Sequence, residues 1–183
     1  GKINPVWPAG GKPTWVRGIL IDYLSILDYS PGPKAVGKWD WVAGANISFK
    51  RKIFDEVGLF DENLDRKGAC LLSSGEEELC KRVRDKGHEI FYTPNMVVDH
   101  IIPSRRLTPN YFLQRAYWQG VSDLLIDLKY LNQEIISGKL KEARDEVTLR
   151  STKLEENFEL VNAMCKSSRA LGYLQSWVSK GLK

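Results

Sequence analysis

The stretch LLSSGEEELCKRVRDKGHEIFYTPNMVVDH, residues 71–100, decides the fold class of this 183-residue chain. Acidic residues at the start of SGEEELCKRVRDKG, basic residues at its end and a closing Gly87 predict a helix within residues 74–87. HEIFYTP and MVVDHII, parted by Pro94 and Asn95, have the composition of short strands. A helix followed by strands indicates an α/β or α+β arrangement for this part of the chain.

Three consecutive glutamates, Glu76, Glu77 and Glu78, begin the predicted helix and allow two interpretations. In the first, they are structural: a preceding serine forms a capping box with the glutamate three residues on, and Glu78 pairs with Arg82 for a few tenths of a kcal/mol. In the second, one carboxylate faces a cleft at the helix start and acts as a general base toward a hydroxyl group. The spacing alone favours the structural interpretation.

The composition excludes several classes of protein. The net charge of +4 is mildly basic and well short of a nucleic-acid-binding signature. No run of about 20 apolar residues is present, as a membrane-spanning helix would require. Three cysteines without CxxC spacing, Cys70, Cys80 and Cys165, argue against a disulfide scaffold or a zinc site. We therefore expect a globular protein in a reducing compartment, in the cytoplasm.

The chain changes character at residue 108. Upstream, we expect one or two short helices within residues 14–30, a strand over WVAGANISFKR (41–51) and a helix in KRKIFDEVG ended by Gly58. Downstream, Thr108 and a proline start a helical region with a break at Gly120. The predicted domains are therefore an α/β part over residues 1–107 and a helical tail or bundle over residues 108–183.

Other polar residues have both structural and functional interpretations. Gly44 and Asn46 fit a close strand approach and a turn, or a surface that lets a sugar reach the backbone. His100 ends a predicted strand, or contacts a metal or a phosphate. Arg105 and Arg106 form a solvated turn, or bind an anionic leaving group. Tryptophans crowd the N-terminal half, where aromatic faces can pack in a core or stack on sugars: Trp7, Trp15, Trp39 and Trp41.

The order of these pieces resembles the C-terminal half of a family-2 inverting glycosyltransferase with the GT-A fold. The resemblance covers roughly residues 1–122 and is strongest in two blocks, GANISFKRKIFDEVGLFDENLDRKG and the 71–100 stretch. It implies a nucleotide-sugar donor, a glycan or lipid-linked hydroxyl acceptor, and a role in polysaccharide or glycan biosynthesis of the cell envelope. A lipid-linked acceptor would place the protein at the inner face of the membrane.

The resemblance also implies roles for individual residues. The catalytic base of the family is the second acid of a pair at this helix start. Counting back from Leu79 places it at Glu76, with Gly75 where the first acid would be, or at Glu77 if the pair has shifted by one residue. Gly44 and Asn46 match the acceptor-side turn.

The remaining positions concern the leaving group. His100 matches a position that contacts the metal or the diphosphate in some relatives, and Arg105 or Arg106 matches the basic residue after it.

The nucleotide-binding units and the metal-binding Asp-x-Asp of the family would lie upstream of Gly1. We therefore expect a divalent metal, Mn or Mg, in a full-length enzyme, no cofactor for this part alone, and no sugar transfer by it. The helical tail would cover the acceptor cleft, pair two protomers or rest on the membrane.

The alternative is a non-catalytic module derived from such a transferase, which binds a carbohydrate or a protein through its aromatic N-terminal half and its helical tail.

Overall fold

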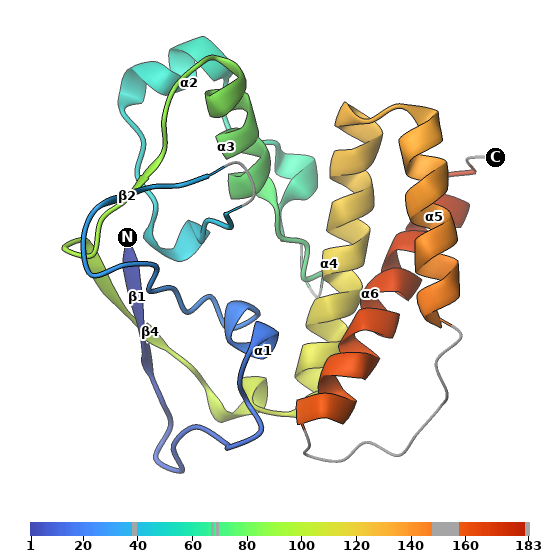
Figure 1. The fold of residues 1–183 in the computed structure, drawn as a ribbon, viewed down its shortest axis with the longest axis horizontal. Helices are drawn as coiled ribbons and strands as arrows, with labels where there is room; N and C mark the ends of the chain where they lie inside the picture. The colour runs from blue at the N-terminus through green and yellow to red at the C-terminus, as the bar shows by residue number, and fades with distance from the viewer. Residues whose placement is uncertain (38–39, 67, 69, 148–157, 182–183) are drawn as a thin grey trace.

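The computed structural model describes residues 1–37, 40–66, 68, 70–147 and 158–181 (Figure 1). Trp39 and part of the predicted tail, residues 148–157, lie outside them. The strands are β1 (Lys2–Val6), β2 (Lys34–Ala35), β3 (Phe91–Tyr92) and β4 (Val97–Ile101). The α-helices are α1 (Ile19–Asp22), α2 (Arg51–Val57), α3 (Gly75–Asp85), α4 (Pro109–Tyr130), α5 (Gln133–Val147) and α6 (Phe158–Ser179). Short 3₁₀ turns are η1 (Gly44–Asn46), η2 (Glu62–Leu64) and η3 (Ser104–Arg106). The class is α/β or α+β, as predicted.

Two small sheets organise the N-terminal part. Strands β1 and β4 pair in parallel, from Lys2 opposite Val97 to Val6 opposite Ile101, and β2 pairs antiparallel with β3. An isolated bridge ties Ile3 to Leu27. Because β1 and β4 come from opposite ends of this part, their pairing brings the end of the 71–100 stretch back to the start of the chain.

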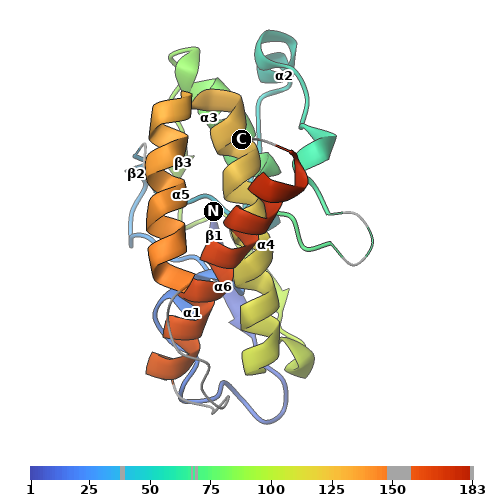
Figure 2. The same ribbon diagram turned by 90° about the vertical axis from the view of Figure 1, so that its right-hand side faces the viewer.

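Helices α4, α5 and α6 form a bundle beside the sheets, and they lie side by side in two perpendicular views (Figures 1 and 2). Helix α4 begins as predicted, because the Thr108 side chain accepts a hydrogen bond from the Tyr111 N–H. The predicted break at Gly120 is wrong, since α4 continues to Tyr130. A Cβ atom at Gly120 would lie 1.8 Å from the carbonyl oxygen of Arg169 in α6, so this glycine permits close packing of two helices.

Local sequence signals were correct for several other elements. Helix α2 ends at Gly58, which has φ 79°, and α3 is followed by Gly87 with φ 83°. Strands β3 and β4 lie within the two predicted segments. The strand expected over residues 41–51 is wrong: η1 occupies its centre, because the chain turns at Gly44–Asn46 instead of pairing with a neighbour.

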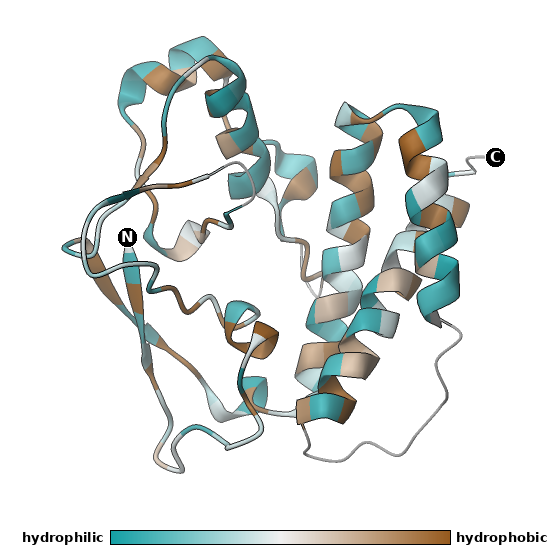
Figure 3. Ribbon diagram, in the orientation of Figure 1, coloured by the Kyte–Doolittle hydropathy of each residue, from teal (hydrophilic) through white to brown (hydrophobic). Residues whose placement is uncertain are grey.

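The hydrophobic core crosses the predicted boundary between residues 107 and 108. Its largest cluster combines Leu20 and Leu24 with Phe112 of α4 and Val161 of α6. A second cluster lies under the sheets and a third within the bundle. Figure 3 shows hydrophobic and hydrophilic residues interspersed along α4, α5 and α6, as in helices that bury one face. In the part of the chain that the structure describes, no helix is both long and apolar enough to cross a bilayer.

Candidate active site

A cavity of about 290 Å³ lies between the start of α3, the η1 turn and the end of β4. Four of the residues singled out from the sequence line it: Gly44, Glu76, His100 and Arg106. The other polar residues of its wall are Ser25, Asp65, Arg66 and Ser73. The fold therefore brings together residues from five separate segments, at the start of the helix that the sequence emphasised.

Glu76 is the second residue of α3, and its position depends on Gly44. The Oε1 atom of Glu76 accepts a hydrogen bond of 3.1 Å from the Gly44 N–H. A Cβ atom at position 44 would lie 3.1 Å from the same oxygen, so a larger residue would press on the carboxylate. The second oxygen of Glu76 remains available toward the cavity, since no described residue hydrogen-bonds to it. A carboxylate held by one oxygen in a polar cavity can accept a proton with the other.

The capping box expected at the start of α3 is absent. Ser74 occupies the N-cap position with φ 166° and makes no side-chain cap bond. Both serines instead contact α4: the Ser73 hydroxyl donates to Gln119 at 3.1 Å and accepts from Arg115, and the Ser74 hydroxyl accepts from Gln119. The serines thus tie the Glu76 end of α3 to α4.

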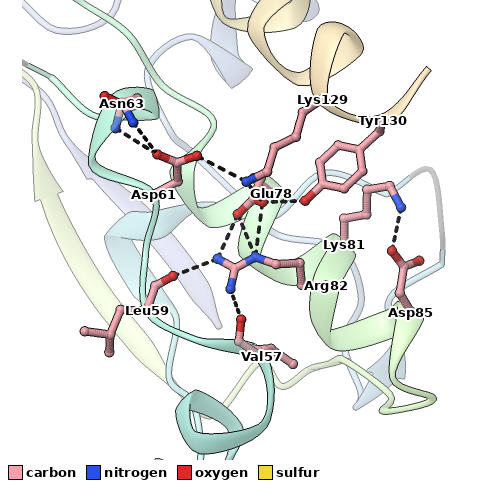
Figure 4. A network of polar contacts seen from close by, with 10 residues as sticks. All are labelled: Val57, Leu59, Asp61, Asn63, Glu78, Lys81, Arg82, Asp85, Lys129 and Tyr130. Carbon is pink, nitrogen blue, oxygen red and sulfur yellow. Dashed lines mark hydrogen bonds and ion pairs between the residues drawn. The ribbon is translucent and has the colours of Figure 1, made fainter. Parts of the chain in front are cut away.

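Glu78 is a structural residue: it forms the predicted pair with Arg82, and this pair is part of a larger buried network. Its side chain is completely buried and accepts hydrogen bonds from Arg82, Lys129 and Tyr130 (Figure 4). Arg82 also donates to the carbonyl groups of Val57 and Leu59. The network joins α3, α4 and the segment between α2 and η2.

The pKa of Glu78 reflects this network. Burial alone would raise the pKa of this carboxyl, but the three donors outweigh it and hold the pKa below the ordinary value. Glu78 is therefore ionised at neutral pH and its charge is shared with its donors.

Glu77 points toward a different part of the molecule. It lines a second cavity, together with Asp123 and Arg169 of the helical bundle. Although the residue is exposed, partial desolvation raises its pKa, and the negative charge of Asp123 acts in the same direction. The structure therefore separates Glu77 from the cavity that Glu76 lines.

His100 and Arg106 line the same cavity as Glu76. The Nε2 atom of His100 is 3.4 Å from Nη1 of Arg106. Burial lowers the pKa of His100, and the charge of Arg106 lowers it further, so the imidazole is neutral at pH 7. Its Nδ1 is buried and has no hydrogen-bond partner among the described residues, and the backbone of Ser25 lies near the imidazole. Ser25 itself has φ 57°, an uncommon conformation for this residue type.

The other predicted contact residues lie away from this cavity. Arg105 is exposed and does not line it. Asn46 donates two hydrogen bonds of 2.8 Å, to the carbonyl groups of Lys2 and Met96, and so ties η1 to the ends of β1 and β4. Its side chain lines a larger, more apolar cavity on the other side of the turn. Among the tryptophans, Trp15 is buried in the largest hydrophobic cluster, and Trp7 packs, partly buried, against the same cluster. Trp41 packs, partly buried, against the cluster under the sheets.

Sequence reasoning missed several residues that shape the cavity. Arg66 lies in a loop that carries no periodic signal, and Ser25 follows a helix of only four residues. Arg115 was hidden inside a helical pattern, although it is 8% exposed and has no carboxylate partner among the described residues. An arginine on the apolar face of a predicted helix was the one available signal for it.

Comparison with known proteins gives one informative match. Over 88 residues the chain is 36% identical to the glucosyl-dolichyl phosphate glucuronosyltransferase of Haloferax volcanii. This chain is related to a glycosyltransferase. The match covers 48% of this chain but only 28% of that protein, so the chain spans less than a third of its relative. No family model matches the chain, and no solved structure matches it.

Proposed function

We propose that this chain is the acceptor-binding and base-bearing part of an inverting glycosyltransferase of family 2, with the GT-A fold. The observation that carries the proposal is the carboxylate of Glu76, fixed by the Gly44 N–H in a cavity that Arg66, His100 and Arg106 also line. Similarity to a glycosyltransferase supports it. By the name of that relative, we propose a sugar-bearing lipid phosphate as acceptor and a nucleotide sugar as donor.

In this mechanism Glu76 is the general base. Its free oxygen accepts the proton of an acceptor hydroxyl while the hydroxyl oxygen attacks the anomeric carbon of the donor. The bond from that carbon to the diphosphate oxygen breaks, the electron pair leaves with the nucleoside diphosphate, and the configuration at the carbon inverts. Arg66 and Arg106 would compensate the negative charge that reaches the diphosphate.

The metal that the resemblance implies does not fit the residues described. Among them no three His, Cys, Asp or Glu side chains converge on one point. Nε2 of His100, the candidate ligand, lies next to the guanidinium of Arg106, and a second cation there would be repelled. A divalent ion would need ligands from further sequence in a longer protein, together with the nucleotide-binding units. We propose that the 183 residues alone transfer no sugar.

The test uses the longest protein encoded by the source gene and a panel of nucleotide sugars with a glucosylated polyisoprenyl phosphate. Glu76→Gln is expected to lower kcat by about 10²–10⁴-fold, because it removes the base and keeps the shape. Glu77→Gln is the matched control on the same helix and should change kcat little. The product, analysed by NMR, should have the inverted anomeric configuration.

Other results would contradict this assignment. If Glu77→Gln abolished activity and Glu76→Gln retained it, the general base would be Glu77. Turnover by the 183-residue chain above its own Glu76→Gln control would show that no further sequence is needed. Binding of a carbohydrate without nucleotide or metal, followed by tryptophan fluorescence, would favour the non-catalytic module.

A further inference from the structure

A surface patch at the outer end of the molecule is unexplained by the proposed reaction. Its apolar members are the three rings of Phe49, Phe54 and Phe60, whose centroids are 5.6 to 6.2 Å apart, and Leu59. Leu59 is 73% exposed and Phe60 46%. We call these four residues, with the three consecutive bases Lys50, Arg51 and Lys52, the basic aromatic patch.

The three bases stand at the wrong end of α2 for helix stability. They occupy the N-cap and the first two positions, where the helix dipole disfavours positive charge, and the first turn contains no acid. Each is exposed, and none forms a salt bridge with another described residue. Because no described carboxylate forms a salt bridge with these charges, they remain available to an anionic partner.

The nearby acids form no salt bridge with the bases. The carboxylate of Glu56 lies 2.6 Å from His88, and that of Asp61 lies 3.1 Å from Nζ of Lys129. Lys52 is close enough to Glu56 to contribute to the lowered pKa of that carboxyl, while Asp55 and Glu62 are exposed and form no salt bridge with a described residue. The patch therefore combines three bases that have no salt bridge with exposed aromatic and aliphatic side chains.

The patch also adjoins the cavity of the candidate active site. Arg82 of α3 donates to the carbonyl groups of Val57 and Leu59, which holds the segment after α2 along α3 (Figure 4). The ring of Phe60 packs beside the first residue of α3, since a Cβ atom at Gly75 would lie 3.9 Å from its Cδ1 atom. Gly75 in turn lines the cavity. In Figures 1 and 2, α2 lies at one extremity of the molecule, away from the α4–α6 bundle. A flat surface could therefore reach the patch.

We propose that the basic aromatic patch docks the protein on the surface of a membrane that contains anionic phospholipids. The bases would contact the lipid phosphates while Leu59 and Phe60 enter the boundary between headgroups and acyl chains. This places the mouth of the Glu76 cavity next to the bilayer. A second copy of the chain fits the patch less well, because a two-fold contact would set two such clusters of bases against each other. Docking needs no sugar transfer, so its failure and that of the proposed function are distinguishable.

The experiment measures co-sedimentation of the 183-residue chain with vesicles of equal parts phosphatidylcholine and phosphatidylglycerol, and with phosphatidylcholine alone. Binding is expected to the anionic vesicles only, and to weaken as salt is added. Leu59→Ser with Phe60→Ser should lower the partition coefficient about tenfold or more through lost apolar burial. Val178→Ser is the matched control, since Val178 is also 73% exposed but lies on α6.

The electrostatic part has its own control. Lys50→Gln with Lys52→Gln should lower binding about 25-fold, about fivefold for each charge. Lys141→Gln with Lys180→Gln changes the net charge equally on α5 and after α6, and should leave binding within about twofold because those positions lie far from the proposed contact. Circular dichroism melts confirm that every variant is folded.

Three outcomes would overturn the proposal. The first is no binding to anionic vesicles. The second is an equal loss in the patch variants and their controls, which would indicate unspecific charge attraction. The third is evidence that protein covers the patch. Such evidence would be a dimer in light scattering that the Leu59 and Phe60 changes abolish, or a longer protein that fails to bind where this chain binds.

Discussion

Glu78 shows how burial changes the energetic weight of an ion pair. An exposed i,i+4 pair contributes little, as the Lys81–Asp85 pair on the same helix illustrates. Glu78 instead has no contact with solvent and accepts from side chains on two helices. Removing its charge would leave Arg82, which is partly desolvated, without a carboxylate partner and would leave Lys129 paired with Asp61 alone.

We predict that Glu78→Gln lowers the free energy of unfolding by about 2 to 3 kcal/mol, less than for a fully buried pair because Arg82 and Lys129 keep contact with water. The corresponding loss in Tm is about 5 to 10 °C. Thermal melts at neutral pH give the measurement, and Asp85→Asn is the control that should leave Tm almost unchanged. An equal effect of the two changes would contradict a dominant role for the buried network.

The pH dependence of the same variant has a defined sign. The folded-state pKa of Glu78 is lowered from 4.5, so its contribution is present above 4.5 and is lost as the pH falls through the lower folded value. The pKa of Lys129 is raised from 10.5, so its contribution is present below 10.5 and is lost above the folded value. The stability difference between wild type and Glu78→Gln should therefore be constant between these limits and shrink in acid. A difference that grows on acidification would contradict it.

Among the candidate site residues, the sequence indicated which side chains to consider but not where they face. Glu76 and Glu77 are adjacent, and only the orientation of α3 against α4 directs them into different cavities. Asn46 was expected at a ligand, whereas the structure shows its amide holding two strand ends together. Contacts of this kind depend on segments far apart in the chain, which local patterns do not encode.

Helix ends were predictable because their signals are local, and helix packing was not. Gly58 and Gly87 marked the ends of α2 and α3 correctly. Gly120 carried the same local signal, but its role comes from α6, and Gly172 of α6 is placed in the same way against Tyr117 of α4. The two glycines let the helix backbones touch.

We predict that Gly120→Ala or Gly172→Ala destabilises the chain by about 3 kcal/mol or more, since the added methyl group would meet backbone atoms that cannot rotate away. The positions a Cβ atom would take are 1.8 Å and 2.0 Å from the opposing carbonyl oxygens. Gly138→Ala on α5 is the matched control: nothing lies near its Cβ position, and the change should stabilise the helix by about 0.5–1 kcal/mol. Chemical denaturation measures both, and a neutral Gly120→Ala would disprove the close contact.

At the scale of the whole molecule, the largest of the three hydrophobic clusters crosses the boundary predicted at residue 108. Val16 and Leu24 pack with Ala116 of α4 and Cys165 of α6. The serine contacts of α3 and the Glu78 network cross the same boundary. The amino-acid composition changes at residue 108, but buried hydrophobic residues from both sides of it pack together.

We therefore expect one cooperative unfolding transition in calorimetry, with equal calorimetric and van't Hoff enthalpies. Residues 1–107 expressed alone should lack a sharp transition, because they lose the α4 and α6 side of their core. Two separate transitions in the whole chain would show independent domains.

The parallel pairing of β1 with β4 has a consequence for how the chain acquires its structure. Partners such as Asn4 and Asp99 are 95 residues apart, and neither strand can form a ladder until the other is available. Closing so large a loop costs chain entropy, and this cost is incurred before the hydrogen bonds of the ladder can stabilise the fold. During synthesis on a ribosome β1 would emerge well before β4 and could pair only after the residues between them had followed. This ladder should therefore be among the last features to form and a candidate for assistance by a chaperone.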